Sequence, residues 1–107
     1  MDGRSRVRNS IGADGLPARQ WADAARARLE REPAIESVRI EVVEVQDEFE
    51  RPVAGIELDV YVRGLEPEAA AALVEREFMH GLADVVGDRE VGWTAYAWEA
   101  LPDNSNP

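Results

Sequence analysis

The clearest alternation of apolar and polar residues covers residues 53–63 and predicts a strand with one buried face. Its apolar positions are Ile56, Leu58, Val60 and Val62, and its polar positions are Glu57, Asp59, Tyr61 and Arg63. Gly64 ends this strand. Pro67 follows three residues later and suits the first turn of a helix, where the missing N–H has no partner to lose. These residues therefore predict a strand, a tight turn and a helix in succession.

Two segments show the spacing of amphipathic helices. The first covers residues 17–32, and its apolar stripe consists of Ala18, Trp21, Ala22, Ala25 and Leu29. The second covers residues 67–86, and its stripe consists of Ala70, Val74, Phe78, Gly81, Leu82 and Val85. Pro33 ends the first helix, and Gly87 is a plausible stop for the second.

Two further strands are expected, at residues 35–46 and 90–100. In the first, Val38, Ile40 and Val42 alternate with polar residues, but Val42 and Val43 are adjacent. This change of phase predicts a β-bulge, or a strand end covered on both faces. In the last strand, one face carries Val91, Trp93, Ala95 and Ala97, and the other carries Thr94, Tyr96 and Trp98.

The expected order is helix, strand, strand, helix, strand. It predicts an α+β fold, a two-layer α/β sandwich with both helices on one face of a three-stranded sheet. Residues 35–46 and 53–63 form an antiparallel hairpin, and the last strand runs parallel to the central one after a crossover helix. This arrangement resembles a ferredoxin-like fold that lacks its first strand. The strand that ends at Val62-Arg63-Gly64-Leu65-Glu66, before an acidic, alanine-rich helix, is similar to a segment of OsmC-type peroxidases. The same element order occurs in the C-terminal half of those proteins and in the cytosolic domain of cation-diffusion transporters. OsmC-type chemistry needs two cysteines, and this chain has none; a transporter-type metal site needs several histidines, and this chain has one.

The chain is expected to hold a single domain at residues 16–102. Residues 1–15 carry Arg4, Arg6 and Arg8 and few apolar side chains, so they are predicted to be a disordered basic tail. Residues 103–107 are predicted to be a polar C-terminal tail.

The net charge of −10 over 107 residues restricts the partners. It argues against nucleic acid, because neutralising phosphates needs a cationic surface. It suits a basic protein as partner, and the absence of a long apolar run argues against a membrane. Without cysteine, disulfides and thiolate metal sites are excluded. A cytoplasmic location is the expectation.

Candidate catalytic chemistry is sparse, and no cofactor or metal is expected. His80 is the only histidine, and its helical position faces solvent. Asp47, Glu48 and Glu50 have a composition suited to hard cations, but they match no known ligand spacing. The sequence also contains no phosphate-binding glycine loop and no nucleophile elbow. An enzyme is therefore not the leading hypothesis.

The leading hypothesis is a protein-association module, a homodimer formed through the uncovered face of the sheet. A two-layer sandwich leaves that face open, and aromatic residues there favour an interface. Its expected contact residues are Tyr61, Tyr96, Trp98, Val43 and Val45. The alternative is a small-ligand-binding protein or enzyme that uses a cleft between the sheet and the second helix, with Trp93 and Glu77 in the pocket.

Overall fold

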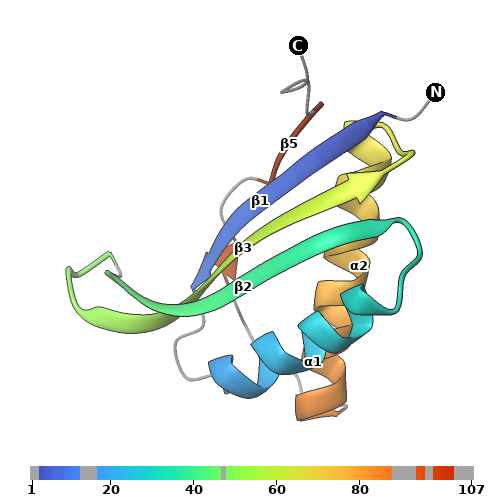
Figure 1. The fold of residues 1–107 in the computed structure, drawn as a ribbon. Helices are drawn as coiled ribbons and strands as arrows, with labels where there is room; N and C mark the ends of the chain where they lie inside the picture. The colour runs from blue at the N-terminus through green and yellow to red at the C-terminus, as the bar shows by residue number, and fades with distance from the viewer. Residues whose placement is uncertain (1–2, 13–16, 47, 88–93, 96–97, 103–107) are drawn as a thin grey trace.

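The computed structural model describes residues 3–12, 17–46, 48–87, 94–95 and 98–102. It shows an α+β fold in which two helices pack on an antiparallel sheet (Figure 1). The elements in chain order are β1 (Arg4–Gly12), α1 (Ala18–Glu30), β2 (Ile35–Gln46), β3 (Pro52–Arg63), α2 (Pro67–Val86), β4 (Thr94–Ala95) and β5 (Glu99–Pro102).

The central hairpin and both helices confirm the sequence analysis. β2 and β3 pair antiparallel from Ile35 opposite Val62 to Gln46 opposite Pro52. The alternation in β3 buries its even-numbered residues from Ile56 to Val62, which is the expected face. The helix α2 begins at Pro67, which occupies its first turn, and ends at Gly87 with a positive φ of 67°.

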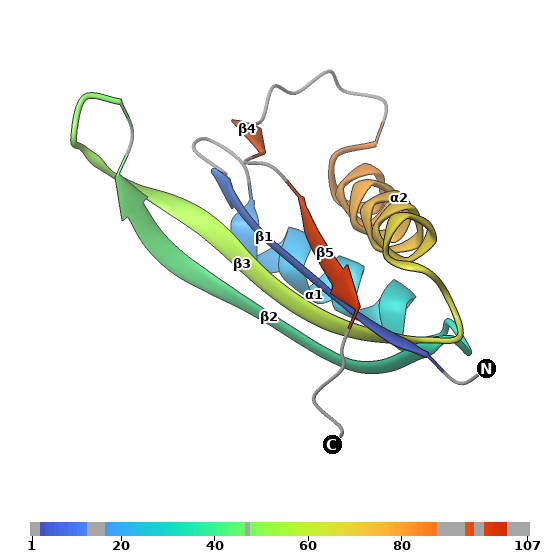
Figure 2. The ribbon, with the colours of Figure 1, turned by 90° about the horizontal axis from the view of Figure 1, so that it is seen from above.

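The sheet has the strand order β2-β3-β1-β4, and β5 also pairs with β1 (Figure 2). The expectation of three strands without a first strand was therefore wrong, and so was that of disorder across residues 1–15. β1 pairs with β3 along its whole length, from Arg4 opposite Arg63 to Gly12 opposite Gly55. The residues expected to form a basic tail thus supply a central strand.

The sequence of β1 lacks the usual alternation of apolar and polar residues, because two of its inward-facing positions are polar. Val7 and Ile11 are fully buried, as expected of a strand, but Ser5 and Asn9 share their face. The hydroxyl of Ser5 has a hydrogen-bond partner, because it donates to the carbonyl oxygen of Leu65 at 2.8 Å. A buried hydroxyl with a partner costs little, so this sequence can form an interior strand.

The last strand differs from the expected single strand over residues 90–100. β4 and β5 are separate, and both pair antiparallel with β1 rather than with β3. β5 still runs in the direction of β3, but β1 lies between them. The parallel neighbour expected for β3 was therefore wrong, because β1 occupies that place.

The predicted β-bulge at Val42 and Val43 was also wrong, and so was the alternative of a strand end covered on both faces, because Val42 is 38% exposed. Pairing between β2 and β3 is regular from Ser37 onward, and its one shift lies between Ile35 and Ser37. The two adjacent valines simply point to opposite faces, as neighbouring strand residues do.

The core lies between the sheet and the helices, which occupy the same side of the sheet (Figure 1). Trp21 of α1 and Phe78 of α2 are both fully buried, and their ring centroids are 4.4 Å apart. The indole N–H of Trp21 donates to the carbonyl oxygen of Phe78 at 2.9 Å. This contact joins the helices and satisfies a polar group that would otherwise be buried alone. Within the described residues, no helix has the length and apolar character needed to cross a bilayer.

Candidate functional site

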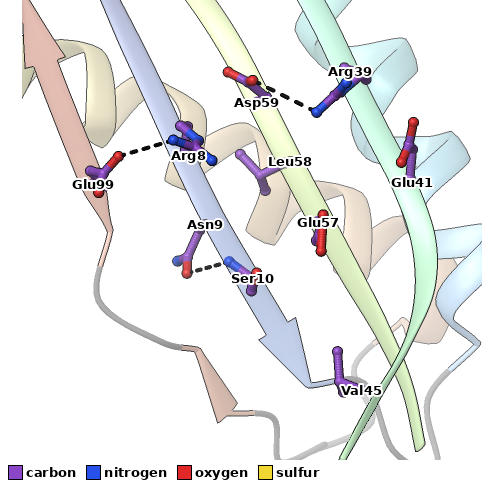
Figure 3. A pocket seen from close by; sticks show the side chains of 10 residues that line it. All are labelled: Arg8, Asn9, Ser10, Arg39, Glu41, Val45, Glu57, Leu58, Asp59 and Glu99. Atoms are coloured by element: carbon purple, nitrogen blue, oxygen red, sulfur yellow. Dashed lines mark hydrogen bonds and ion pairs between the residues drawn. The ribbon is translucent and has the colours of Figure 1, made fainter.

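The candidate site is the side of the sheet opposite the helices, here called the open face. When this side is viewed directly, the helices lie behind the strands (Figure 3). In β3 the open face carries Glu57, Asp59 and Tyr61, because these positions alternate with the buried ones. Register then assigns Arg8 of β1 and Arg39 of β2 to the same face, since both lie opposite Asp59.

A row of alternating charges crosses the middle of this face on four neighbouring strands. It runs in the order Arg39, Asp59, Arg8 and Glu99, from β2 through β3 and β1 to β5. Arg39 Nη2 lies 4.0 Å from Asp59 Oδ2, and Arg8 Nη1 lies 3.5 Å from Glu99 Oε1 (Figure 3). Opposite charges on adjacent strands stabilise pairing, so this charged row helps to hold the sheet together.

Asp59 is the most constrained carboxylate of the face. Its side chain is only 12% exposed, and Arg6 donates to both of its oxygens, from Nε at 2.9 Å and from Nη2 at 2.6 Å. These hydrogen bonds hold the pKa of Asp59 below its ordinary value, against the opposing effect of burial. The charges of Arg8 and Arg39 lower this pKa further. Asp59 is therefore an anion at neutral pH and is unsuited to donate a proton there.

Basic side chains gather at one end of the open face, around Tyr61. The guanidinium of Arg4 lies 4.7 Å from the centre of the Tyr61 ring, and that of Arg6 lies 5.4 Å from it. Arg63 is exposed, and its Cα lies opposite that of Arg4. Arg4 also forms an ion pair with Glu36 at 2.9 Å. We call Arg4, Arg6, Tyr61 and Arg63 the basic end of the face.

Carboxylates gather at the other end. Glu41 and Glu57 lie directly opposite each other on β2 and β3, and both are exposed. Among the described residues, neither has a hydrogen bond or an ion pair with a basic group. Like charges in this position destabilise strand pairing. We call this pair the acidic end.

The open face is hollowed over the charged row and the acidic end. The hollow has a volume of about 560 Å³, and its lining includes Arg8, Arg39, Asp59 and Glu57 (Figure 3). Val45, from the far end of β2, also contributes to it. The lining is mainly polar, so the hollow differs from the apolar pockets that usually hold small ligands.

The pairing of β1 is interrupted beside this hollow. Ile11 lies opposite Ala95 in β4, and Arg8 lies opposite Glu99 in β5. Between these two pairs, β1 covers three residue steps, from Ile11 to Arg8, whereas its partner covers four, from Ala95 to Glu99. The backbone N–H of Ser10, in the interrupted stretch, donates to Oδ1 of Asn9 at 2.7 Å. Asn9 is 7% exposed, and its Nδ2 has no hydrogen-bond partner among the described residues.

The structure places the expected contact residues in different environments. Tyr61, Val43 and Val45 lie on the open face and are partly buried. Trp98 lies on the other side, where it packs against the core with its ring edge-on to Phe78, 6.3 Å between centroids. The expectation of Trp98 on the open face was wrong, because the one-residue shift between β4 and β5 exchanges the faces. Tyr96 lies outside the described residues.

Of the two residues expected in a ligand pocket, Trp93 and Glu77, the structure describes only Glu77. Glu77 is buried between the two helices, where it forms ion pairs with Arg28 at 3.6 Å and Arg76 at 3.1 Å. Arg28 also donates to both oxygens of Asp84, and these hydrogen bonds lower the pKa of Asp84. Glu77 thus belongs to a network that joins the helices. Trp93 lies outside the described residues, and the hollow occupies the opposite face of the sheet from α2.

The sequence analysis missed four residues that shape the face: Arg4, Arg6, Arg8 and Glu99. The signal for the three arginines was present, since they alternate with Ser5 and Val7 in the period of a strand. The described residues contain no group of three or more histidine, cysteine, aspartate or glutamate side chains that could hold a metal ion. His80 is exposed on α2.

Comparison with known proteins does not identify a family. No family model matches the sequence, and no curated protein matches it either. Among solved structures, the chain is similar to "a putative aminohydrolase from methicillin resistant Staphylococcus aureus", with a TM-score of 0.41 and 18% sequence identity. The similarity covers 92% of this chain and 28% of that one. Nothing about the function of this chain follows from it.

Proposed function

We propose that this chain is a protein-association module that forms a homodimer through the open face of its sheet. The observation that supports this most is the charge balance of that face. The whole chain has 22 acidic and 12 basic residues. On the described strands, the arginines of the open face are matched in number by its carboxylates; they are Arg4, Arg6, Arg8, Arg39 and Arg63 against Glu36, Glu41, Glu57, Asp59 and Glu99.

Such a balance is what a second copy of an acidic protein requires. Two copies carrying −10 each repel one another, and the repulsion is weakest where positive and negative charges are equal. The open face is the part of the described sheet where that condition holds. A homodimer through the helices would instead bring the surplus carboxylates of two copies together.

The charges of the face are also arranged for self-pairing. They separate along the strands into the basic end around Tyr61 and the acidic end at Glu41 and Glu57. A two-fold axis that turns one copy end over end directs the basic end of each copy toward the acidic half of the partner's β2–β3 hairpin, which begins at Glu41 and Glu57. Charge complementarity of this kind fixes orientation and excludes other arrangements.

Apolar side chains on the same face supply contact area. Val43 and Val45 are partly buried in the single chain, and Leu101 of β5 is 56% exposed. Leu101 lies opposite Arg6 and so joins the basic end. A tyrosine buries much area at a low cost in side-chain entropy, which suits Tyr61 to an interface contact at the basic end.

Sedimentation velocity at concentrations up to roughly 100 µM tests the proposal, since a dimer with a dissociation constant at or below this concentration is then well populated. We expect a monomer–dimer equilibrium. Glu57→Arg should raise the dissociation constant about tenfold, which corresponds to about 1.4 kcal/mol. Glu75→Arg makes the same charge change on an exposed position of α2 and should leave the equilibrium unchanged or slightly favour dimers. A strict monomer at every concentration would overturn the proposal.

A basic protein as a second partner stays a prediction. Among the described residues, carboxylates also lie away from the open face, including Glu66, Glu68, Glu75 and Asp84 on and beside α2.

A further inference from the structure

The hairpin of β2 and β3 extends beyond the rest of the sheet. β1 ends at Gly12, opposite Gly55, so the β3 residues before Gly55 have no described strand on their β1 side. Figure 1 shows the two strands continuing past this point as a projecting ribbon. We call the described residues 44–46 and 48–54 the arm.

None of the described side chains of the arm is buried. Val45 and Val53 lie opposite each other on the side of the open face and are only partly buried. Phe49, near the tip, is 67% exposed, with the guanidinium of Arg51 5.1 Å from its ring centre. An isolated two-stranded hairpin is marginally stable in water, and such ribbons gain stability by packing against another surface.

The described residues of the arm carry a net negative charge. Glu44, Glu48 and Glu50 are exposed carboxylates, and Arg51 is its one described basic side chain. The arm is therefore an acidic ribbon with an exposed aromatic ring and valines on one side. A surface that matches it needs guanidinium groups beside an aromatic or aliphatic platform.

The basic end of the open face has this chemistry. Tyr61 lies there partly exposed, flanked by Arg4 and Arg6, with Arg63 one row further along. Within one chain the arm cannot reach it. Val53 and Arg63 lie at opposite ends of β3, about 33 Å apart at about 3.3 Å per residue.

We infer that in the homodimer each arm lies over the basic end of the partner's open face. This inference rests on the proposed function. The two-fold axis that turns one copy end over end directs each arm toward the far end of its partner, and both contacts then form at once. The occupant of the basic end is the arm of a second copy, with its carboxylates against Arg63 and Arg4 and with Phe49 and Val53 against Tyr61.

A charge-reversal cycle tests this contact. Arg63 and Glu48 suit it because the described structure shows neither in an ion pair that a substitution would break. Arg63→Glu alone and Glu48→Arg alone should each raise the dissociation constant about tenfold at low salt, where screening is weak. The double variant should recover to within about threefold of the original value, because the reversed charges again match across the dimer. The two residues are too far apart within one chain to rescue each other.

A cross-linking experiment gives an independent readout. Because the chain has no cysteine, only the introduced thiols can react. One copy carries Phe49→Cys, and a differently tagged copy carries Tyr61→Cys. A short bis-maleimide should join the two tags after mixing. The matched control pairs Phe49→Cys with Glu75→Cys on α2, which should remain unlinked.

The outcomes separate the two proposals. A protein that stays monomeric overturns the homodimer and the arm contact together. A protein that dimerises, but in which the single reversals have no effect or the double variant fails to recover, overturns the arm contact alone. Linking of residue 49 to residue 75 in place of residue 61 also overturns the arm contact, because it places the arm on the partner's helices.

Discussion

Gly81 in α2 faces the backbone of Ala25 in α1 so closely that a side chain at residue 81 has no room. A Cβ atom at this position would lie 2.8 Å from both Cα and N of Ala25. The two helices meet at this point, beside the buried pair of Trp21 and Phe78. Small residues on both helices therefore set how closely α1 and α2 approach.

Gly81→Ala is expected to lower the free energy of unfolding by about 1 to 3 kcal/mol, because an overpacked contact with backbone atoms forces the helices apart. In an exposed helix the same change would stabilise by about 1 kcal/mol, so the sign of the effect is informative. Urea denaturation measures it. Gly3→Ala is the matched control, since a Cβ there meets no atom within 4 Å, and it should change stability by less than about 0.5 kcal/mol. A stabilised Gly81→Ala protein would contradict the close approach.

The ion pair of Asp59 with Arg6 makes stability depend on pH in a definite direction. The folded-state pKa of Asp59 is lowered, chiefly by the hydrogen bonds from Arg6. In the unfolded chain an aspartate titrates near pH 3.9, so below about that pH the unfolded state binds more protons than the folded state. The stabilisation from Asp59 is thus fully present above about pH 4 and is lost as the pH falls through the folded-state value.

Asp59→Asn should therefore lower the free energy of unfolding by about 1 to 2 kcal/mol at pH 7, a range that allows for the partial exposure of Arg6. Below about pH 4 the difference from the unmodified protein should shrink. Urea denaturation at pH values between about 2 and 7 measures both effects. Glu75→Gln, on an exposed position of α2, should leave the stability at pH 7 nearly unchanged. A constant difference between Asp59→Asn and the unmodified protein at all pH values would contradict the assignment.

The hairpin and both helices could be predicted from the sequence because their signals are local. The alternation of apolar residues in 53–63 can be read within one strand, and each apolar stripe can be read within one helix. β1 could not be recognised in the same way. Half of its inward positions are Ser5 and Asn9, and what makes Ser5 acceptable there is the carbonyl of Leu65, sixty positions later in the chain. That partner is visible only in the folded protein.

The placement of Trp98 shows a second limit of prediction from sequence. Unbroken alternation from Ala95 would leave Trp98 on the open face. Because the pairing with β1 shifts by one residue before Glu99, Trp98 lies on the core side and Glu99 on the open face. A shift of one residue reverses every position that follows it. The expected aromatic interface therefore becomes a face dominated by charges, with Tyr61 as its one described aromatic side chain.

The side chain of Asn9 is predicted to protect the amide of Ser10, where the pairing of β1 is interrupted. Oδ1 of Asn9 accepts the Ser10 N–H at 2.7 Å. Asn9→Ala removes this acceptor, and we expect the Ser10 amide hydrogen to exchange about tenfold faster, as measured by hydrogen exchange and NMR. Asn9→Asp keeps an oxygen at the same position and should retain the protection. Equal exchange rates in all three proteins would show that another group protects the amide.

Trp98 and Tyr61 were both expected at the interface. From their positions in the structure, we expect substitution of Trp98 to affect stability and substitution of Tyr61 to affect association. Trp98 packs edge-on to the buried ring of Phe78, so Trp98→Ala should lower the free energy of unfolding by about 2 to 3 kcal/mol, less than for a fully buried tryptophan. It should leave the dissociation constant of the proposed dimer unchanged where the protein is folded. Tyr61→Ala removes a partly exposed ring from the open face and should instead raise that constant about tenfold, with a smaller effect on stability. Urea denaturation and sedimentation velocity on the same samples separate the two effects. Weaker association in Trp98→Ala, with unchanged stability, would place its ring at the interface and contradict the assignment of the open face.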